Sequence, residues 1–488
     1  MAKFLMIQGT ASGVGKSTIV SGLLRYFVQK GFRVAPFKAV NMSLHSGVTP
    51  FGEEIARSQL LQAQAAKVPP DARMNPILLK PEGGSIQVVL KGRVFSRLQP
   101  FAPFPQEVFW KAIAESLDAL NAAFDLVIAE GMGSPVEINL RERDLANMRL
   151  AKCFRMPVLL VGDIERGGVF AALYGTWALS GEDRQFIQGF IINKLRGDAT
   201  VLEPGTRELE RLTGVPVLGI LPHFPLLLDD EDGASFTFRH RVLSPYALRV
   251  GVLRFPHASN LTDFLPLELE EDVDVRFVSL WERFDDFDLL ILPGTKNTMR
   301  DLAFAHSVSL GERLLAFVRA GRVVLGVCGG FQMLGAVVED PYGVEEGGSM
   351  RGFGLLPLVT TLAKEKTLAL SRGYSPLLGA YVQGYEIHHG KSSLTTSCEP
   401  LFLLDGGYPE GVVQEGRIFG TYLHGLFDEG KFRRAFLNYV RSLRGLPPHL
   451  TESISWQVFV DKELDGLANF LAQHLNMPLL ERVLGLSE

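Results

Sequence analysis

The feature that most constrains the fold is a series of short, continuous apolar runs separated by segments with helical periodicity. Such runs are typical of strands buried on both faces of a parallel sheet, whereas half-exposed strands alternate polar and apolar residues. Most of the candidate strands are runs of this kind. The candidates are Phe4–Ile7, Val34–Phe37, Leu126–Ala129, Pro157–Val161 and Phe190–Asn193 in the first half, and Leu248–Leu253, Val273–Val278, Leu289–Leu292, Val323–Val327, Tyr381–Ile387 and Arg417–Phe419 in the second. The sequence therefore predicts an α/β fold with two parallel-sheet domains.

An acidic stretch, Asp229–Gly233, separates the two sets of runs. We place a first domain at 1–232, a linker at 233–247, a second domain at 248–446 and a helical extension at 447–488. The apolar spacing of Glu463–Leu484 suits packing on a sheet or on a partner, so we expect the extension to be structural. A chain of 488 residues is long enough for two or three separate cores.

Charge and cysteine content exclude several classes of protein. The net charge of −5, from 49 basic and 54 acidic residues, gives no reason to expect a nucleic-acid or anionic membrane partner. Three cysteines, Cys153, Cys328 and Cys398, are an odd and unspaced set, which argues against a disulfide framework or a zinc site. We expect a cytoplasmic protein without signal peptide or transmembrane helix, since no apolar run reaches membrane-spanning length. The oligomeric state is not indicated.

The first domain begins with a strand, a glycine-rich loop and a helix in that order. After Phe4–Ile7 come Gly-Thr-Ala-Ser-Gly-Val-Gly-Lys-Ser-Thr at 9–18 and a helical pattern at 19–28. Loop N–H groups and the helix dipole bind phosphates, Lys16 reaches their outer oxygens, and the Ser17 hydroxyl can ligate Mg²⁺. Thr10 stands where the strict phosphate-loop pattern has Gly. The expected nucleotide contacts are Thr10, Ser12, Gly13, Val14, Gly15, Lys16, Ser17 and Thr18.

This longer form of the loop resembles the dethiobiotin-synthetase-like branch of phosphate-loop proteins. The resemblance implies ATP and Mg²⁺ as cofactors, with Lys38 beside the transferred phosphate and the substrate carboxylate. It places Glu130, at a strand end, as a metal ligand, and Glu54, at the head of an expected helix 55–66, as a second candidate. Asn193 is the residue that would read the adenine edge. For Glu54 and Glu130 the alternative is a solvated helix or loop residue, and for Asn193 a polar strand end.

The second domain contains a cysteine at a sharp turn. The run Val323–Val327 leads into Cys328-Gly329-Gly330, and small residues there allow the strand-to-helix turn of a nucleophile elbow. A helix N-terminus would lower the thiol pKa. The alternative is a buried cysteine in a glycine-rich turn.

A histidine follows a second strand-like run, at Tyr422-Leu423-His424. A turn after Leu289–Leu292 includes Gly294, whose N–H could complete an oxyanion hole with that of Gly329. Together these segments resemble a class I glutamine amidotransferase domain, which implies Cys328 as nucleophile and His424 as proton carrier. Many such domains have Glu two residues after the His, and Leu426 stands there in this chain. Glu386 and Asp428 are candidates for orienting His424.

The whole chain resembles the cobyric acid synthase family. The matching segments are 130–148, 36–43 and 162–170, which neither a phosphate loop nor a glutaminase requires. The resemblance implies three small-molecule substrates: L-glutamine, ATP and adenosylcobyrinic acid a,c-diamide. The b, d, e and g carboxylates would be phosphorylated and then amidated by ammonia from glutamine, to give adenosylcobyric acid. We expect a sheltered ammonia route between the domains, because a protonated amine is no nucleophile.

Two other functions fit parts of the sequence. One is the a,c-diamide synthase, which acts earlier in the same pathway of cobalamin biosynthesis. The segment 137–143 favours the cobyric acid synthase family over it. The other is an ATP-driven switch of the partitioning-protein type, in which Cys328 would have no chemistry and glutamine would be ignored. Neither a basic tail nor a basic balance supports the switch.

Overall fold

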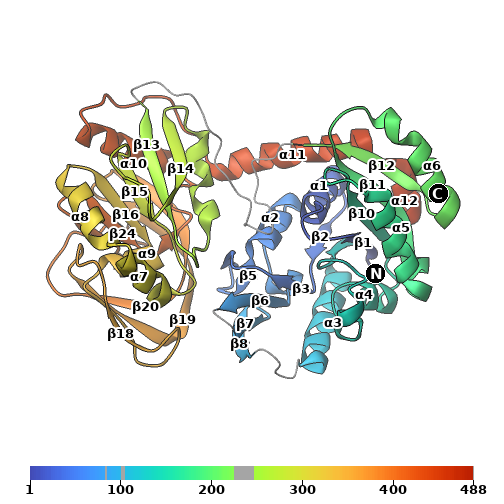
Figure 1. Ribbon diagram of the computed structural model, residues 1–488, viewed down its shortest axis with the longest axis horizontal. Helices are drawn as coiled ribbons and strands as arrows, with labels where there is room; N and C mark the ends of the chain where they lie inside the picture. Colours follow the sequence, from blue (N-terminus) through green and yellow to red (C-terminus); the bar gives the residue numbers. More distant parts are fainter. Residues whose placement is uncertain (83–84, 100–104, 225–246, 487–488) are drawn as a thin grey trace. The chain divides into compact units, whose positions relative to one another are not determined.

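The chain folds into two compact units, both of the α/β class (Figure 1). The computed structural model describes residues 1–82, 85–99, 105–224 and 247–486. The first unit comprises Met1–Ser43, Thr49–Ala234 and Val460–Glu488, and the second comprises Leu44–Val48 and Ser235–Phe459. The stretch Asp229–Gly233 and the predicted linker up to residue 246 lie outside the described residues. The last 29 residues group with the first unit and do not stand apart as an extension.

A parallel sheet forms the centre of the first unit, as the apolar runs predicted. Its six strands lie in the order β12-β11-β10-β1-β9-β2. They are β1 (Lys3–Gly9), β2 (Val34–Phe37), β9 (Leu126–Glu130), β10 (Val158–Asp163), β11 (Ile187–Leu195) and β12 (Val217–Pro222). The phosphate loop and Glu130 follow or end the neighbouring strands β1 and β9, where Ile7 pairs with Glu130. The carboxyl ends of the strands thus bring the predicted nucleotide residues to one edge, as parallel pairing requires.

Helices cover both faces of this sheet. Residues of α3, α4, α5 and α6 share one core with alternate strand residues, and α1 packs against β1, β2 and β9 from the other face. The helices of the unit are α1 (Lys16–Gln29), α2 (Arg57–Ala65), α3 (Gln106–Ala123), α4 (Met148–Cys153), α5 (Val169–Leu179), α6 (Glu203–Thr213), most of α11 (Trp456–His474) and α12 (Met477–Val483).

A small second sheet in the first unit was not predicted. Its strands lie in the order β3-β6-β7-β8, and β6, β7 and β8 form an antiparallel meander. They are β3 (Val40–Met42), β6 (Ile77–Glu82), β7 (Ser85–Leu90) and β8 (Arg93–Leu98). Glu54 begins a short strand, β5 (Glu54–Ala56), and α2 begins only at Arg57. The expectation that Glu54 heads a helix was therefore wrong.

The second unit is also built on a largely parallel sheet. Its strands lie in the order β14-β13-β15-β16-β24-β23, and only β23 runs antiparallel to its neighbour. They are β13 (Leu248–Arg254), β14 (Val273–Ser279), β15 (Leu289–Leu292), β16 (Val323–Val327), β23 (Val412–Gln414) and β24 (Ile418–Thr421). The helices are α7 (Thr298–Ser307), α8 (Leu310–Arg319), α9 (Gly329–Leu334) and α10 (Gly430–Leu443), with the short 3₁₀ helix η5 (Leu261–Leu269) after β13.

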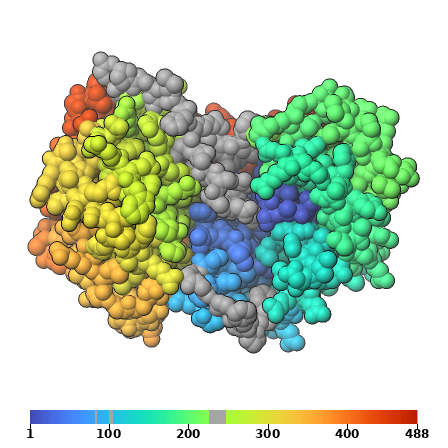
Figure 2. Space-filling model, in the orientation of Figure 1, coloured from blue at the N-terminus to red at the C-terminus, as the bar shows by residue number. Residues whose placement is uncertain are grey.

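The predicted parallel strand Tyr381–Ile387 belongs to a different sheet. It lies within β20, which pairs antiparallel with β19 and β25, so its assignment to the parallel sheet was wrong. The strands of this sheet are β17 (Val337–Asp340), β18 (Gly348–Arg351), β19 (Leu358–Ser375), β20 (Ala380–Leu394), β21 (Phe402–Leu404), β22 (Pro409–Glu410) and β25 (Leu423–His424). On the face shown in Figure 2, residues from the middle of the chain, coloured yellow-green to orange, form the surface of the second unit.

A five-residue segment from the first half of the chain, Leu44–Val48, is part of the second unit. It contains the strand β4 (Ser46–Val48). Ser46 N donates to Asn260 Oδ1 at 3.1 Å, and Asn260 N donates to His45 Nδ1 at 3.0 Å. Val48 packs against Tyr385 and Ile387 of β20. No pattern in the sequence predicts the position of this segment.

Candidate active sites

Cys328 lies at the sharp turn that the sequence predicted. It follows β16 directly, its φ of 51° and ψ of −108° are strained for a residue with a Cβ, and α9 begins at Gly329. The glycines are needed, because a Cβ at Gly329 would lie 2.3 Å from Thr295 Cγ2 and one at Gly330 would lie 2.1 Å from Leu292 O. The turn therefore presents the buried Cys328 thiol at the carboxyl edge of the parallel sheet.

His424 lies beside Cys328 because β24, the neighbour of β16 in the parallel sheet, ends at Thr421, only three residues before His424. Val327 pairs with Thr421 in the parallel ladder, and Cys328 N donates to Thr421 O at 2.8 Å. His424 is 1% exposed, and its ring stacks on Tyr385 with centroids 5.2 Å apart. Burial lowers the pKa of His424, but the Asp263 carboxylate and the Cys328 sulfur outweigh it and raise this pKa to about 10. The protonated form of the His424 ring is therefore favoured between the Asp263 carboxylate and the Cys328 sulfur.

The group that contacts the second nitrogen of His424 is Asp263, which sequence reasoning missed. Asp263 Oδ2 lies 2.6 Å from His424 Nδ1, and Tyr385 Oη donates to Asp263 Oδ1 at 3.3 Å. Asp263 belongs to η5 and is 1% exposed. The signal in the sequence is an acidic residue within the mainly apolar stretch 261–267, and this does not connect it to His424.

Glu386 and Asp428, the two residues that the sequence suggested for orienting His424, have other contacts. Glu386 accepts from Ser371 Oγ at 2.6 Å and lies 3.4 Å from His388 Nε2. Burial raises the pKa of Glu386, but these two groups outweigh it and lower this pKa. Asp428 lies next to Gly425, where a Cβ would be 3.2 Å from Asp428 Oδ2. Asp263, and neither of these two, is hydrogen-bonded to the His424 ring.

Gly294 faces the space between the thiol and the imidazole. A Cβ at Gly294 would lie 3.0 Å from His424 Cε1 and 3.7 Å from Cys328 Cβ. Gly330 N donates to Pro293 O, so that the turn after β15 is fastened to the start of α9. The predicted oxyanion residues Gly294 and Gly329 thus both lie close to Cys328.

The phosphate loop joins β1 to α1 with the predicted geometry. Gly15 caps α1 in the left-handed region with a φ of 97°, and a Cβ there would collide with Asn193 Nδ2 at 2.2 Å. Lys16 Nζ donates to Ala11 O at 3.0 Å and Gly133 O at 3.4 Å, which bends the side chain over the loop. Thr10 N donates to Val161 O, and Ser12 is exposed at the tip of the loop.

Glu130 is the centre of a buried polar cluster beside this loop. It accepts from Ser17 Oγ at 2.8 Å, Lys38 Nζ at 2.8 Å and Gln62 Nε2 at 2.6 Å. Burial raises the pKa of Glu130, but Lys38, Ser17 and Lys16 outweigh it and hold the pKa below its usual value. Three of the predicted residues, Ser17, Lys38 and Glu130, are thus brought together, and Gln62 is an addition from α2.

Glu54 pairs with Lys80, at 2.6 Å, with both side chains buried. Among the described residues no three His, Cys, Asp or Glu side chains converge as ligands for a metal ion. The oxygens of Ser17 and Glu130 are hard donors, and Mg²⁺ usually takes only one or two protein ligands besides phosphates and water. The Ser17–Glu130 pair therefore fits a phosphate-bound Mg²⁺.

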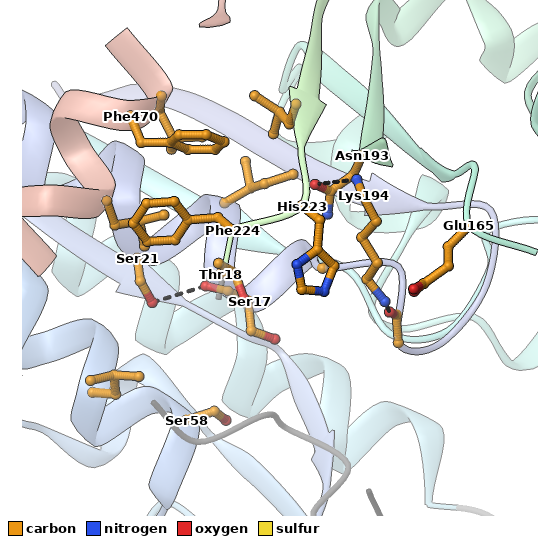
Figure 3. Close-up of a pocket in the computed structure, with 17 residues that line it drawn as sticks. Ser17, Thr18, Ser21, Ser58, Glu165, Asn193, Lys194, His223, Phe224 and Phe470 are labelled. Carbon is orange, nitrogen blue, oxygen red and sulfur yellow. Dashed lines mark hydrogen bonds between the residues drawn. The ribbon is translucent and has the colours of Figure 1, made fainter. Parts of the chain in front are cut away.

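A cavity of about 260 Å³ opens beside the phosphate loop (Figure 3). Asn193 lies on its wall, but its Nδ2 donates to Val14 O at 2.8 Å and its Oδ1 accepts from Lys194 N at 2.9 Å. The cavity is lined by Gly13, Gly15, Ser17, Thr18, Ile19, Ser21, Ser58, Leu61, Glu165, Asn193, Lys194, Leu221, His223, Phe224, Leu467, Phe470 and Leu471.

Comparisons with known proteins match both halves of the chain. The model of the CobQ/CobB/MinD/ParA nucleotide binding domain matches residues 5–232, and that of the CobB/CobQ-like glutamine amidotransferase domain matches residues 249–432. A cobyric acid synthase from Caldanaerobacter subterraneus subsp. tengcongensis is 43% identical, covering 99% of each chain. One from Desulforudis audaxviator is 45% identical, covering 99% of this chain and all of that one. The chain belongs to the cobyric acid synthase family.

Membership of the cobyric acid synthase family confirms the resemblance drawn from the sequence. The nucleotide-binding match includes the phosphate loop and Glu130, and the amidotransferase match includes Cys328, His424 and Asp263. The helix α11 lies outside both matched ranges, although three of its residues line the cavity. Over the described part of the chain, no helix has the length and apolar character needed to cross a membrane.

Proposed function

We propose that this protein is a glutamine-dependent amide ligase that converts the b, d, e and g carboxylates of adenosylcobyrinic acid a,c-diamide to amides, forming adenosylcobyric acid. The observation that supports this most strongly is the family match over 99% of the chain, with a thiol–imidazole–carboxylate set in one unit and a phosphate loop in the other. Glutamine supplies the nitrogen and ATP supplies the energy. A cytoplasmic setting is proposed as well, because a reactive thiol needs a reducing compartment.

In the second unit, Cys328 Sγ attacks the side-chain carbonyl carbon of glutamine and forms a thioester. His424 gives its proton to the departing nitrogen as the C–N bond breaks, which releases ammonia. The N–H groups of Gly329 and Gly294 stabilise the oxyanion. His424 then takes a proton from the water that hydrolyses the thioester. Asp263 orients the ring and stabilises its charged form, a role supported by the 2.6 Å contact to Nδ1.

In the first unit, the loop from Thr10 to Thr18 holds the phosphates of ATP. A substrate carboxylate attacks the γ-phosphorus, ADP leaves, and Lys16 and Lys38 neutralise charge on the transferred group. Ammonia attacks the acyl phosphate and phosphate leaves. Ser17 and Glu130 would hold Mg²⁺, which supplies charge neutralisation when bound. Because Glu54 is paired with Lys80, we do not include it among the proposed Mg²⁺ ligands. The ammonia route stays a prediction.

The test is mass spectrometry of adenosylcobyrinic acid a,c-diamide after incubation with ATP, Mg²⁺ and glutamine. We expect four successive carboxylate-to-amide conversions. Cys328→Ala should abolish them with glutamine and retain them with ammonium. If the protein is incubated with cobyrinic acid in place of the a,c-diamide, conversion at only two carboxylates would identify it as the a,c-diamide synthase instead. Absence of any change in the corrinoid, with glutaminase activity intact, would refute the substrate.

A further inference from the structure

The cavity beside the phosphate loop has a polar end and an apolar end. Its polar end is formed by the loop and the first residues of α1, where phosphates would bind. The other end is apolar: α11 contributes Leu467, Phe470 and Leu471 to the lining, and Phe470 lies there beside Phe224 (Figure 3). A ligand that fills this cavity therefore carries anionic groups at one end and an apolar or aromatic group at the other.

Two aromatic rings meet at the apolar end. The ring centroids of Phe224 and Phe470 lie 4.6 Å apart with an interplanar angle of 37°. Phe224 follows β12, and Phe470 lies on α11, more than 240 residues later in the chain. Both rings are only half-buried, so each keeps surface available to a ligand. Planar bases bind such rings by stacking.

The hydrogen bonds of Asn193 favour a different role from reading adenine. Both ends of its amide are bonded to backbone groups, Val14 O and Lys194 N, and Gly15 packs against it. Lys194 Nζ adds a bond to Gly13 O at 2.6 Å. These contacts hold the phosphate loop in place. Binding of a base then depends on other residues of the cavity.

The helix α11 is firmly docked on α1, which begins at the phosphate loop. Arg25 of α1 is fully buried and donates to Asp461 at 2.5 Å and to Asp465 at 3.3 Å. Gly22 makes room for the helix, since a Cβ there would lie 2.5 Å from Leu471 Cδ1. The wall formed by α11 is therefore a fixed part of the first unit.

We propose that α11 completes a purine-binding pocket, in which the adenine of ATP lies against Phe470, Phe224 and Leu471. The inference rests on the proposed ATP-dependent function and adds the residues that select the base. The carboxy-terminal helix is then a determinant of nucleotide specificity, where the sequence indicated only a structural segment. The pocket contacts the base and the phosphate loop contacts the phosphates, so the two contributions can be measured separately.

The experiment compares Phe470→Ala and Leu471→Ala with Gln473→Ala, a change at an exposed position on the same helix. Calorimetry measures binding of ATP and of inorganic tripolyphosphate, which has the phosphates but no base. We expect Phe470→Ala to weaken ATP binding by roughly tenfold and to leave tripolyphosphate binding unchanged. Phe470→Tyr, which keeps the ring, should restore ATP binding. Gln473→Ala should match the wild type with both ligands.

Two outcomes would overturn the pocket: unchanged ATP binding in Phe470→Ala, or an equal loss for ATP and tripolyphosphate. Unchanged tripolyphosphate binding in each variant shows that the first unit, to which these residues of α11 belong, is folded. The proposed function is tested separately, because wild-type protein that binds ATP but does not amidate the corrinoid would refute the function and leave the pocket standing. Wild-type protein that amidates the corrinoid while Phe470→Ala binds ATP normally would refute the pocket alone.

Discussion

Asp263 Oδ2 lies 2.6 Å from His424 Nδ1, although 161 residues separate the two in the chain. The first comes from η5 after β13 and the second from β25, so the pair depends on the sheet order of the second unit. The contact fixes which ring nitrogen of His424 faces Asp263, and hence which one is left toward Cys328. We infer that Asp263 takes the role of the acid that many class I domains have at the position of Leu426.

Replacing Asp263 by Asn should therefore disable the glutaminase. Asn cannot stabilise the imidazolium, and we expect the kcat for glutamine hydrolysis to fall by roughly 10²–10⁴-fold. Amidation with ammonium should continue. Glu386→Gln and Asp428→Asn are the controls, and both should lose less than Asp263→Asn. An equal or larger loss in either one would return the orienting role to that residue.

The same pair predicts how stability depends on pH. The pKa of His424 is about 10 in the folded protein, against an ordinary value of 6.5. Its proton therefore stabilises the fold fully below pH 6.5, where the unfolded chain is also protonated, and this contribution is lost as pH rises through about 10. Because Asp263→Asn removes the main raising influence, its Tm should be lower than that of the wild type at pH 6, and the gap should narrow at pH 8 and 10. A gap independent of pH would contradict the raised pKa.

Adding one methyl group at Gly294 should obstruct the same site without straining the backbone. In Gly294→Ala the new Cβ would lie 3.0 Å from His424 Cε1, within the space that glutamine needs. We expect a glutaminase loss of about 10²-fold, the size associated with small displacements of reacting groups. The control is Gly175→Ala in α5, where a Cβ meets nothing within 4 Å. Full activity in Gly294→Ala would place the bound amide elsewhere.

Glu130→Gln should separate the two activities in the opposite sense. The change leaves Lys38 buried without its charged partner, which costs about 3–5 kcal/mol of stability. It also removes an oxygen charge proposed to hold Mg²⁺. Amidation should be lost with glutamine and with ammonium alike, while glutamine hydrolysis at Cys328 continues. The exposed Glu107→Gln is the matched control. Retained amidation in Glu130→Gln would remove Glu130 from the synthetase site.

Sequence reasoning succeeded where neighbouring residues determine the geometry. The turn at Cys328, the phosphate loop and the strand ending at Glu130 are all local features, because glycines and an apolar run suffice to form them. The parallel sheets also followed from continuous apolar runs.

Long-range features were missed for a physical reason. Asp263 meets His424 only after η5 packs beside β25, and no spacing along the chain encodes that contact. The antiparallel pairing of β20 with β19 was missed, although Tyr381–Ile387 was predicted as a strand, because both strands mix exposed and buried residues and β19 contains no continuous apolar run that reveals it. Phe470 approaches the nucleotide cavity through docking of α11 on α1, which again joins distant segments.

The division of the chain between its units determines the order in which they can be completed during synthesis. The first unit includes Val460–Glu488, and α11 supplies part of its nucleotide cavity. During translation from the amino terminus, this cavity cannot be completed until the whole second unit has left the ribosome. The segment Leu44–Val48, by contrast, is synthesised well before Asn260 and Tyr385, the residues that it contacts in the folded second unit. A truncated chain that ends within the second unit would therefore have the phosphate loop but lack the part of the cavity wall that α11 supplies.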